Sequence, residues 1–210
     1  MEHMDLLFQR YPALEGCREA VYAAAEAIIA CYKAGGKVLL CGNGGSCADC
    51  EHIAGELMKG FLKKRPLSPE KKAAMQAACP ALTDGMLEGL QGSLPAIPLT
   101  GMSALSTAWG NDVNYELGFA QQLLGLGRPG DVLIAISTGG NAKNVAAAAA
   151  VAGGLGITVI GLTGISGGRL AEMAGICIKV PESETYKIQE LHLPVYHALC
   201  AEAEAAFFAE

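Results

Sequence analysis

The chain has 210 residues, of which 51% are hydrophobic and 17% are charged. This length supports one large hydrophobic core and leaves little room for two full domains. The net charge is −6 and no basic cluster is longer than Lys63–Arg65, which disfavours nucleic-acid binding by charge. No apolar run approaches the roughly 20 residues that span a bilayer, and the acidic N-terminus lacks the layout of a signal peptide, so we expect a cytoplasmic protein.

The first predicted elements are helical. Apolar residues recur at helical spacing over residues 13–32, and Pro12 separates this helix from a shorter piece that begins near residue 5. The glycine pair at 35–36 ends the helix. Residues 1–34 are therefore predicted to form an N-terminal helical segment in front of the main domain.

Five short apolar runs follow, and most of them lack an alternation of polar and apolar residues. This pattern is typical of strands that are covered on both faces. Helical stretches separate the runs, an order that predicts right-handed crossovers and a single doubly wound α/β sheet flanked by helices. The predicted strands are residues 37–41, 95–99, 131–136, 158–163 and 176–180, and a final amphipathic helix is predicted over 186–210.

Two glycine-containing turns stand directly before predicted helices. The first, Gly42–Ser46, ends the first strand, and the second, Ser137–Asn141, follows the third. Glycines let backbone N–H groups approach a ligand, the start of a helix favours an anion, and the Ser46 hydroxyl adds a donor. Neither turn has the nucleotide P-loop or dinucleotide-binding pattern. Together they predict a site for a small phosphorylated metabolite.

Residues 59–94 interrupt the alternation of strands and helices. The first part of this segment is basic and contains prolines, and residues 76–92 are helix-prone with several breakers. We interpret it as an insertion before the second strand. Two interpretations stay open: a surface excursion, which we favour, or a lid or subunit arm over the ligand.

The cysteines are predicted to be reduced. Eight of them are scattered through apolar helices and strands, where they behave as small hydrophobic residues. Cys47 and Cys50 form a C-x-x-C at a helix start, a pattern that redox pairs and zinc sites share. No second C-x-x-C exists in the sequence, so both of these roles are disfavoured.

Two helices carry the candidate catalytic groups. His52 and Glu56 are four residues apart on the helix after the first turn, which puts them on one face beside the predicted anion site. Gln189 and His197 share a face of the last helix, although Pro194 lies between them. A carboxylate and a second acid/base group suit proton abstraction next to a carbonyl, and the four side chains also form a mixed N/O set suited to zinc. An ordinary surface pair and packed histidines are the structural alternatives.

An ordered set of motifs resembles the sugar isomerase (SIS) domain proteins and, among them, the bacterial phosphoheptose isomerases. The resemblance covers about residues 35–210, which we interpret as an SIS domain with an insertion at about 59–94. The motifs are Gly42–Ser46, His52–Glu56, Gly110–Asp112, Gly130–Thr138, Gly161–Gly164 and Ile188–His192, followed by His197.

The resemblance implies a fold, an activity and a site. The fold would be a five-stranded parallel sheet in a homotetramer, with the terminal helices packing in the oligomer and active sites at subunit contacts. The reaction would convert sedoheptulose 7-phosphate to D-glycero-D-manno-heptose 7-phosphate through an ene-diolate, with Glu56 as the base and His197 as the second acid/base group. The implied zinc ligands are His52, Glu56, Gln189 and His197. The substrate-binding residues would be Asn43, Gly44, Gly45, Ser46, Asp112, Ser137, Thr138 and Gln189.

The chain departs from the family pattern at three positions. Gly139 and Ala142 stand where the second turn of the family usually has serines, so two hydroxyl donors to the phosphate are missing. Gly60 stands where an arginine often follows the catalytic glutamate, and Lys59 or Arg65 could supply the missing cation. These differences leave the identity of the sugar phosphate open.

Three alternative functions share features with this chain. A non-catalytic SIS protein of the replication-initiator-binding type generally lacks a glutamate at the position of Glu56, so its presence favours an enzyme. A sugar-phosphate sensor usually carries a regulatory domain, for which this chain has no room. An isomerase of another sugar phosphate is the nearest alternative.

Overall fold

The computed structural model of the chain describes residues 1–208. Five strands form one parallel sheet in the order β2-β1-β3-β4-β5, which confirms the predicted α/β sheet. Each strand lies within one residue of its predicted bounds. The strands are β1 (Val38–Gly42), β2 (Ala96–Pro98), β3 (Val132–Ile136), β4 (Thr158–Thr163) and β5 (Ile176–Lys179).

Helices cover both faces of the sheet, so the strands are buried on both sides. In β1, Val38 and Leu40 face one hydrophobic cluster, whereas Leu39 and Cys41 face the other. This alternation follows from the two-residue period of a strand. The helices on the first face are α1 (Glu2–Arg10), α2 (Arg18–Lys33), α3 (Gly45–Met58) and α10 (Thr185–Phe207). Those on the second face are α7 (Gly118–Leu126), α8 (Lys143–Gly154) and α9 (Gly168–Met173).

The N-terminal region differs in detail from its prediction. A 3₁₀ helix, Pro12–Cys17, precedes α2, where the apolar pattern predicted an α-helix from residue 13. Proline lacks an N–H and Gly16 is a poor helix former, so a regular α-helix begins only after both. Met4 and Leu7 of α1 are buried in the same cluster as the strands. A boundary at residue 34 stays a prediction.

The last helix, α10, continues through Pro194 without a break. The ring is buried, and the helix loses one backbone hydrogen bond there while its apolar face stays packed. Outside residues 59–94, the remaining described helices are short: α6 (Ser103–Trp109), two 3₁₀ turns (Leu99–Gly101 and Tyr115–Leu117) and a π-helical turn (Gly110–Asn114). Residues 209–210 of the predicted last helix lie outside the described residues. Among residues 1–208, no helix has the length and hydropathy that crossing a membrane requires.

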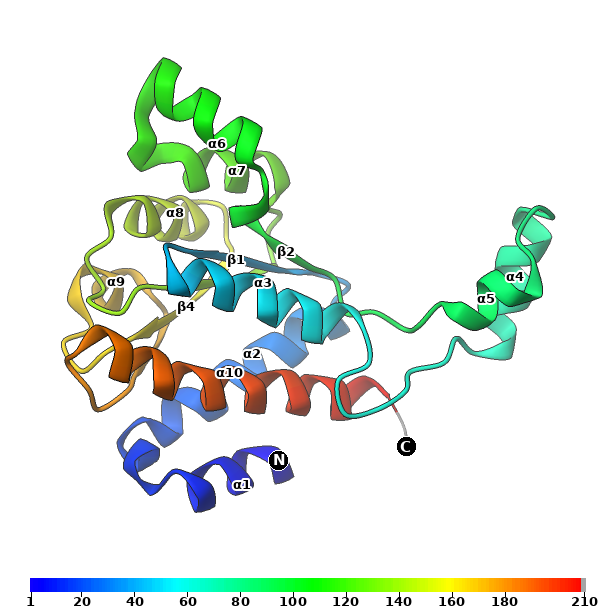
Figure 1. The fold of residues 1–210 in the computed structure, drawn as a ribbon, viewed down its shortest axis with the longest axis horizontal. Coiled ribbons are helices and arrows are strands. Elements are labelled where there is room, and N and C mark those ends of the chain that lie inside the picture. Colours follow the sequence, from blue (N-terminus) through cyan, green and yellow to red (C-terminus); the bar gives the residue numbers. More distant parts are fainter. Residues whose placement is uncertain (209–210) are drawn as a thin grey trace.

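The insertion at 59–94 forms an arm that projects from the domain (Figure 1). It carries α4 (Pro69–Ala78) and α5 (Asp84–Gly89), so helical structure begins earlier than the predicted 76–92. At the first turn of α4, the Ser68 side chain accepts a hydrogen bond from the Lys71 N–H. A bridge between Pro66 and Gln91 closes its base. The arm leaves the C-terminal end of α3, whereas the first glycine-rich turn lies at the other end, about 20 Å away for a helix of this length. Within one chain, the arm is therefore a surface excursion and does not cover that turn.

Candidate active site

Helices α3 and α10 lie side by side and run in the same direction. Near their starts, a Cβ added at Gly45 would lie 2.2 Å from Nε2 of Gln189, so the two residues are in contact. Two turns further along, the rings of His52 and His197 are 5.0 Å apart. The fold thus brings together side chains that are more than a hundred residues apart in the sequence.

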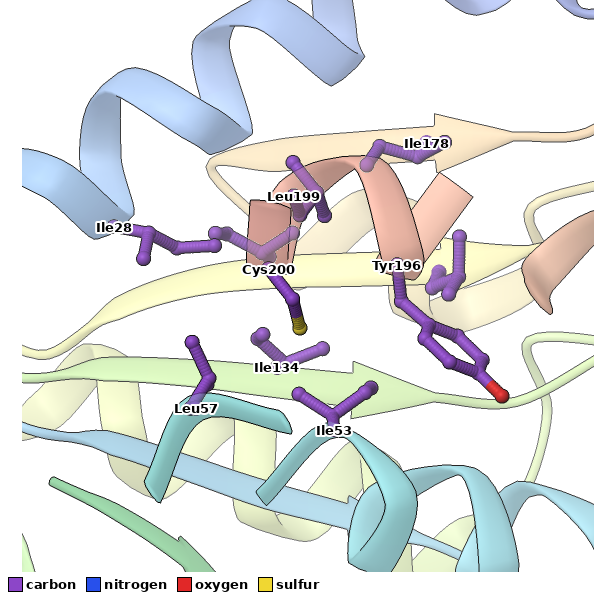
Figure 2. Close-up of a pocket in the computed structure, with 10 residues that line it drawn as sticks. Ile28, Ile53, Leu57, Ile134, Ile178, Tyr196, Leu199 and Cys200 are labelled. Atoms are coloured by element: carbon purple, nitrogen blue, oxygen red, sulfur yellow. The ribbon is translucent and has the colours of Figure 1, made fainter. Parts of the chain in front are cut away.

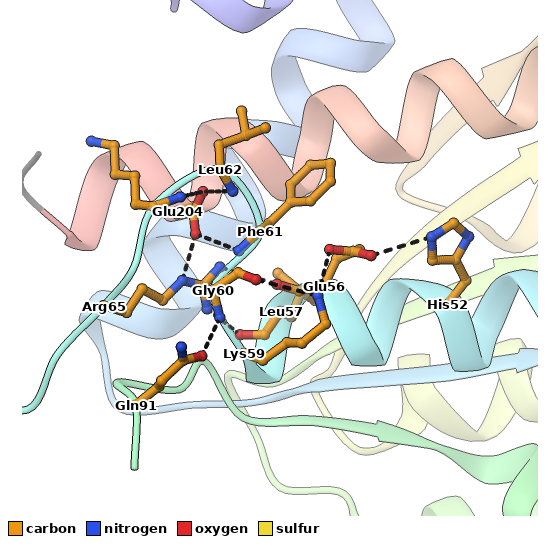
Figure 3. A network of polar contacts seen from close by, with 11 residues as sticks. His52, Glu56, Leu57, Lys59, Gly60, Phe61, Leu62, Arg65, Gln91 and Glu204 are labelled. Carbon is orange, nitrogen blue, oxygen red and sulfur yellow. Dashed lines mark hydrogen bonds and ion pairs between the residues drawn. The ribbon is translucent and has the colours of Figure 1, made fainter. Parts of the chain in front are cut away.

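The predicted pair on α3 is in contact. Nε2 of His52 lies 3.3 Å from Oε1 of Glu56, and Nζ of Lys59 lies 3.3 Å from Oε2 of the same carboxylate (Figure 3). The Glu56 side chain is 13% exposed, so the carboxylate is largely enclosed and still reachable. Contacts to both oxygens fix its orientation.

Tyr196 and Asp49 form a hydrogen-bonded pair that contacts the other ring nitrogen of His52. The Tyr196 hydroxyl donates to Oδ1 of Asp49 at 3.2 Å and lies 3.1 Å from Nδ1 of His52. Since a phenol has one hydrogen, its oxygen accepts from Nδ1–H of the ring. Nε2 of His52 then faces the Glu56 carboxylate. This arrangement fixes the orientation of the imidazole.

Asp49 and Tyr196 were missed by the sequence analysis. Asp49 lies three residues before His52 and Tyr196 lies next to His197, but only the packing of α3 on α10 brings the two together. Figure 2 shows the Tyr196 ring among apolar side chains with its hydroxyl directed away from them. The gap between these apolar groups holds about 10 Å³, too little for a sugar phosphate. The ring is therefore held by core packing while its hydroxyl reaches the site.

His197 presents a free ring nitrogen. Its Nε2 is buried and has no hydrogen-bond partner among the described residues, and its ring packs against Phe61 at 5.6 Å. Burial is the largest cause that holds the pKa of His197 below its ordinary value, and the nearby His52 lowers the pKa further. The Glu56 carboxylate opposes this shift. A neutral imidazole can give or take a proton at neutral pH.

The other histidine of α10 is a core residue. His192 is 0% exposed, and burial lowers its pKa to about 4. It therefore stays neutral at physiological pH and takes no part in the site. Sequence spacing alone could not separate the roles of His192 and His197.

The two glycine-containing turns lie at the carboxyl edge of the sheet. Gly42 pairs with Ile136, so β1 and β3 end side by side. The side-chain amides of Asn43 and Asn144 exchange two hydrogen bonds of 2.9 Å, which join the first turn to α8. Gly44 has φ +57, a conformation that glycine adopts without strain. Backbone N–H groups of both turns therefore lie at one edge.

A cleft of about 260 Å³ opens beside the first turn. Ser46 and Ser137 lie near the turns but are mostly buried, at 4% and 8% exposed, while Thr138 is half-buried. The residues lining the cleft come from β1, α3, the segment 100–119 and α8: Gly42, Asn43, Gly44, Cys47, Thr100, Ser106, Tyr115, Gly118, Phe119 and Asn144. Its size suits a small ligand.

Two of the predicted residues lie elsewhere. Asp112 is exposed on the π-helical turn, and its one hydrogen bond among the described residues comes from the Asn111 amide at 2.8 Å. Arg65 was one of two residues that could supply the cation missing at Gly60, but its side chain is 0% exposed and is paired with Glu204. Lys59 is 61% exposed and stays available as a cation.

The C-x-x-C motif has no sign of redox chemistry. All eight cysteines are free. Cys50 is buried, and burial raises the pKa of its thiol, so the reactive thiolate is disfavoured. Cys47 is half-buried, with its Sγ 3.8 Å from Oε1 of Glu51. The sequence interpretation of reduced cysteines stays a prediction.

The predicted zinc ligands match a metal site in chemistry but not in arrangement. His52 and Glu56 point electron-pair donors toward each other, and the free Nε2 of His197 lies beside them. Within residues 1–208, however, no three His, Cys, Asp or Glu side chains are grouped so that they could hold a metal ion. Gln189 lies over Gly45 at the start of α3. The described side chains as they lie do not form a ready metal site.

Comparisons with known proteins agree with this geometry. The family model described as the SIS domain matches residues 12–97 and 85–164. A phosphoheptose isomerase of Rhodospirillum rubrum is 40% identical over 193 residues, which cover 92% of this chain and 89% of that protein. One of Mycobacterium tuberculosis is 41% identical over 191 residues, covering 91% and 84%. The solved phosphoheptose isomerase of Neisseria gonorrhoeae superimposes with a TM-score of 0.75 at 33% identity, covering 97% of this chain and 96% of that one.

The parallel sheet with its two phosphate-type turns and the matching family model define the class: the chain belongs to the SIS domain family. Within that class, the full-length matches at about 40% identity place it among the phosphoheptose isomerases. The chain is thus an isomerase of sugar phosphates.

Proposed function

We propose that this protein converts sedoheptulose 7-phosphate to D-glycero-D-manno-heptose 7-phosphate. The observation that carries the proposal is that His52 joins the two proposed catalytic groups: it contacts Glu56 on α3 and packs against His197 of α10, on the helix that starts at the turn after β1. A carboxylate and a neutral imidazole are the two groups that an aldose–ketose isomerisation needs. Membership in the phosphoheptose isomerases indicates which sugar phosphate is the substrate.

In the proposed mechanism, the Glu56 carboxylate takes a proton from C1 of the ketose. An ene-diolate forms, and the same carboxyl group returns the proton to C2 to give the aldose. His197 is the proposed group that moves the hydroxyl proton between the two oxygens. His52 and Lys59 hold the carboxylate in place, so little reorganisation precedes the proton transfer.

We further propose that the turns hold the substrate. The backbone N–H groups of the turns and the hydroxyls of Ser137 and Thr138 would bind the phosphate, far from the reacting carbons, and thereby orient them. The remaining proposed substrate contacts are Asn43, Gly44, Gly45, Ser46, Asp112 and Gln189. Binding of the phosphate at the start of α3 places the sugar along this helix, toward Glu56.

Proton NMR of the protein with sedoheptulose 7-phosphate in D₂O tests the reaction. We expect new aldose resonances and deuterium at C2, because the abstracted proton exchanges with solvent on the carboxylate. Neither signal from folded protein would contradict the proposal. A panel of pentose, hexose and heptose phosphates in the same assay then identifies an isomerase of another sugar phosphate, which the missing serines at Gly139 and Ala142 favour as the second candidate.

Replacing Ser137 by Ala is expected to raise KM about tenfold with little change in kcat, the size of one lost hydrogen bond to a charged phosphate. The matched control is Thr158→Ala, which removes an exposed hydroxyl at the opposite edge of the sheet. Steady-state kinetics of both variants measure the effect. An unchanged KM for Ser137→Ala would place the phosphate elsewhere.

Zinc stays a prediction, with His52, Glu56, Gln189 and His197 as the proposed ligands. When bound, zinc would stabilise negative charge on the substrate oxygens. If zinc is used, chelation is expected to lower kcat and added Zn²⁺ to restore it, and metal analysis of the purified protein should show about one ion per chain. Full activity in protein free of metal would leave Glu56 and His197 as a metal-free acid/base pair.

A homotetramer with sites at subunit contacts, formed in part by the terminal helices, also stays a prediction, as does cytoplasmic location. A groove of about 320 Å³ between α1 and α10 supports a subunit contact, because it reaches His197. Exposed apolar side chains line it, namely Leu6 at 46%, Leu62 at 60% and Leu193 at 41%. Light scattering of the purified protein gives the subunit number.

A further inference from the structure

A fully buried ion pair joins the end of α3 to α10. Nε of Arg65 lies 2.7 Å from Oε1 of Glu204, and the two side chains are 0% and 1% exposed. Removing two charges from water costs several kcal/mol per ion unless every polar atom finds a partner. The remaining polar atoms of the pair therefore need partners of their own.

The guanidinium of Arg65 binds the last turn of α3. Nη1 donates to the carbonyl of Leu57 at 2.6 Å and Nη2 to the carbonyl of Glu56 at 3.0 Å (Figure 3). These carbonyls lie in the final turn, where a helix has no backbone donors left to satisfy them. Arg65 therefore caps the helix at the residue that carries the proposed base.

Glu204 holds the other side of the network. Its carboxylate accepts backbone N–H groups from three consecutive residues of the turn after α3, at 2.9, 2.7 and 3.2 Å, namely Phe61, Leu62 and Lys63. The ring of Phe61 packs against His197. Glu204 also lies two helical turns after His197 on α10, on the same side of the helix. The ion pair thus contacts the backbone of Glu56 directly and reaches His197 through Phe61.

The backbone at Arg65 is held in an unusual conformation. Its φ is +50, the one positive value outside glycine among residues 1–208. Such a conformation costs about 1 kcal/mol or more and persists where surrounding contacts determine it. Five N–H groups in a fixed plane let arginine reach a carboxylate and two carbonyls at once, which the single ammonium of lysine cannot do.

We propose that Arg65 and Glu204 are positioning residues for the isomerisation: together they fix the distance between the Glu56 carboxylate on α3 and the His197 ring on α10. This inference rests on the proposed roles of Glu56 and His197. It gives the buried pair a function besides stability, because a shift of about 1 Å between two acting groups can lower a rate about a hundredfold.

The test is Arg65→Lys, measured by steady-state kinetics below its melting temperature. We expect kcat to fall by about ten- to a hundredfold while KM stays within about twofold, because the turns that hold the phosphate are at the other end of α3. The matched control is Asp131→Asn, which breaks the Lys37–Asp131 ion pair of 2.6 Å at the amino edge of the sheet. It should lower stability and leave kcat unchanged.

A double-mutant cycle with Glu56→Gln separates positioning from general damage. If Arg65 acts through Glu56, adding Arg65→Lys to Glu56→Gln should lower the residual activity by less than about twofold. An equal loss in both backgrounds, or an unchanged kcat for the single variant, overturns the inference. High activity in Glu56→Gln alone overturns the proposed base instead, so the two failures are distinguishable.

Glu204→Gln provides a second variant in case Arg65→Lys does not fold. It keeps one acceptor oxygen and removes the charge, and it is expected to show the same loss of kcat at constant KM. If neither variant folds at any temperature, the pair serves stability alone and the inference is wrong.

Discussion

Replacing Glu56 by Gln is expected to lower kcat by at least about a hundredfold, the lower end of general-base contributions. The amide has nearly the shape of the carboxylate and keeps an oxygen for Lys59 or His52, so the fold should be retained. What it loses is the ability to accept a proton from carbon. NMR in D₂O measures the loss directly, since deuterium should no longer enter C2 of the product.

The control for this experiment is Glu19→Gln, a change of the same chemistry at an exposed position of α2. It should leave kcat and KM unchanged. Circular dichroism and thermal unfolding of both variants confirm that the fold is present. Full turnover by folded Glu56→Gln would show that another group takes the proton, and the assignment of the base would then be wrong.

Replacing Gly140 by Ala is expected to lower the free energy of unfolding by about 2–4 kcal/mol, through backbone strain and a steric clash. Gly140 has φ +67, and a Cβ there would lie 1.9 Å from the carbonyl oxygen of Gly167. The neighbouring atoms are backbone and cannot rotate away. Any relaxation must displace the turn that carries Ser137 and Thr138, so KM should rise as well.

The adjacent Gly139 is the matched control. It lacks a positive φ, and an added Cβ would meet nothing within 4 Å. Gly139→Ala is therefore expected to change stability by less than about 0.5 kcal/mol. Chemical denaturation of the two variants makes the comparison. Equal effects at both positions would contradict the clash with Gly167. The open space also means that a serine, usual in the family here, fits this turn.

The sheet could be predicted because its strands carry local information. Each of these strands is a short apolar run bounded by glycine or polar residues, and burial on both faces favours apolar side chains. The His52–Glu56 pair was predictable for a similar reason, since residues four apart on a helix always share a face.

The buried ion pair of Arg65 and Glu204 could not be predicted in this way. Arg65 stands in a basic, exposed-looking sequence, yet its side chain is 0% exposed because Glu204 and two helix carbonyls compensate its charge. That partner lies 139 residues away. Local composition carries no information about a contact between residues so far apart in the sequence. From the sequence, Arg65 was therefore interpreted as a surface cation.

By itself, the sequence determined the doubly wound sheet, the two turns at its carboxyl edge and the face shared by His52 and Glu56, since each depends on neighbours within a few residues. Only the tertiary structure decided that α3 packs along α10, that His197 and not His192 meets His52, and that Asp49 and Tyr196 support it. The physical reason is that these contacts depend on how two helices pack together over one sheet, which the spacing within either helix does not specify.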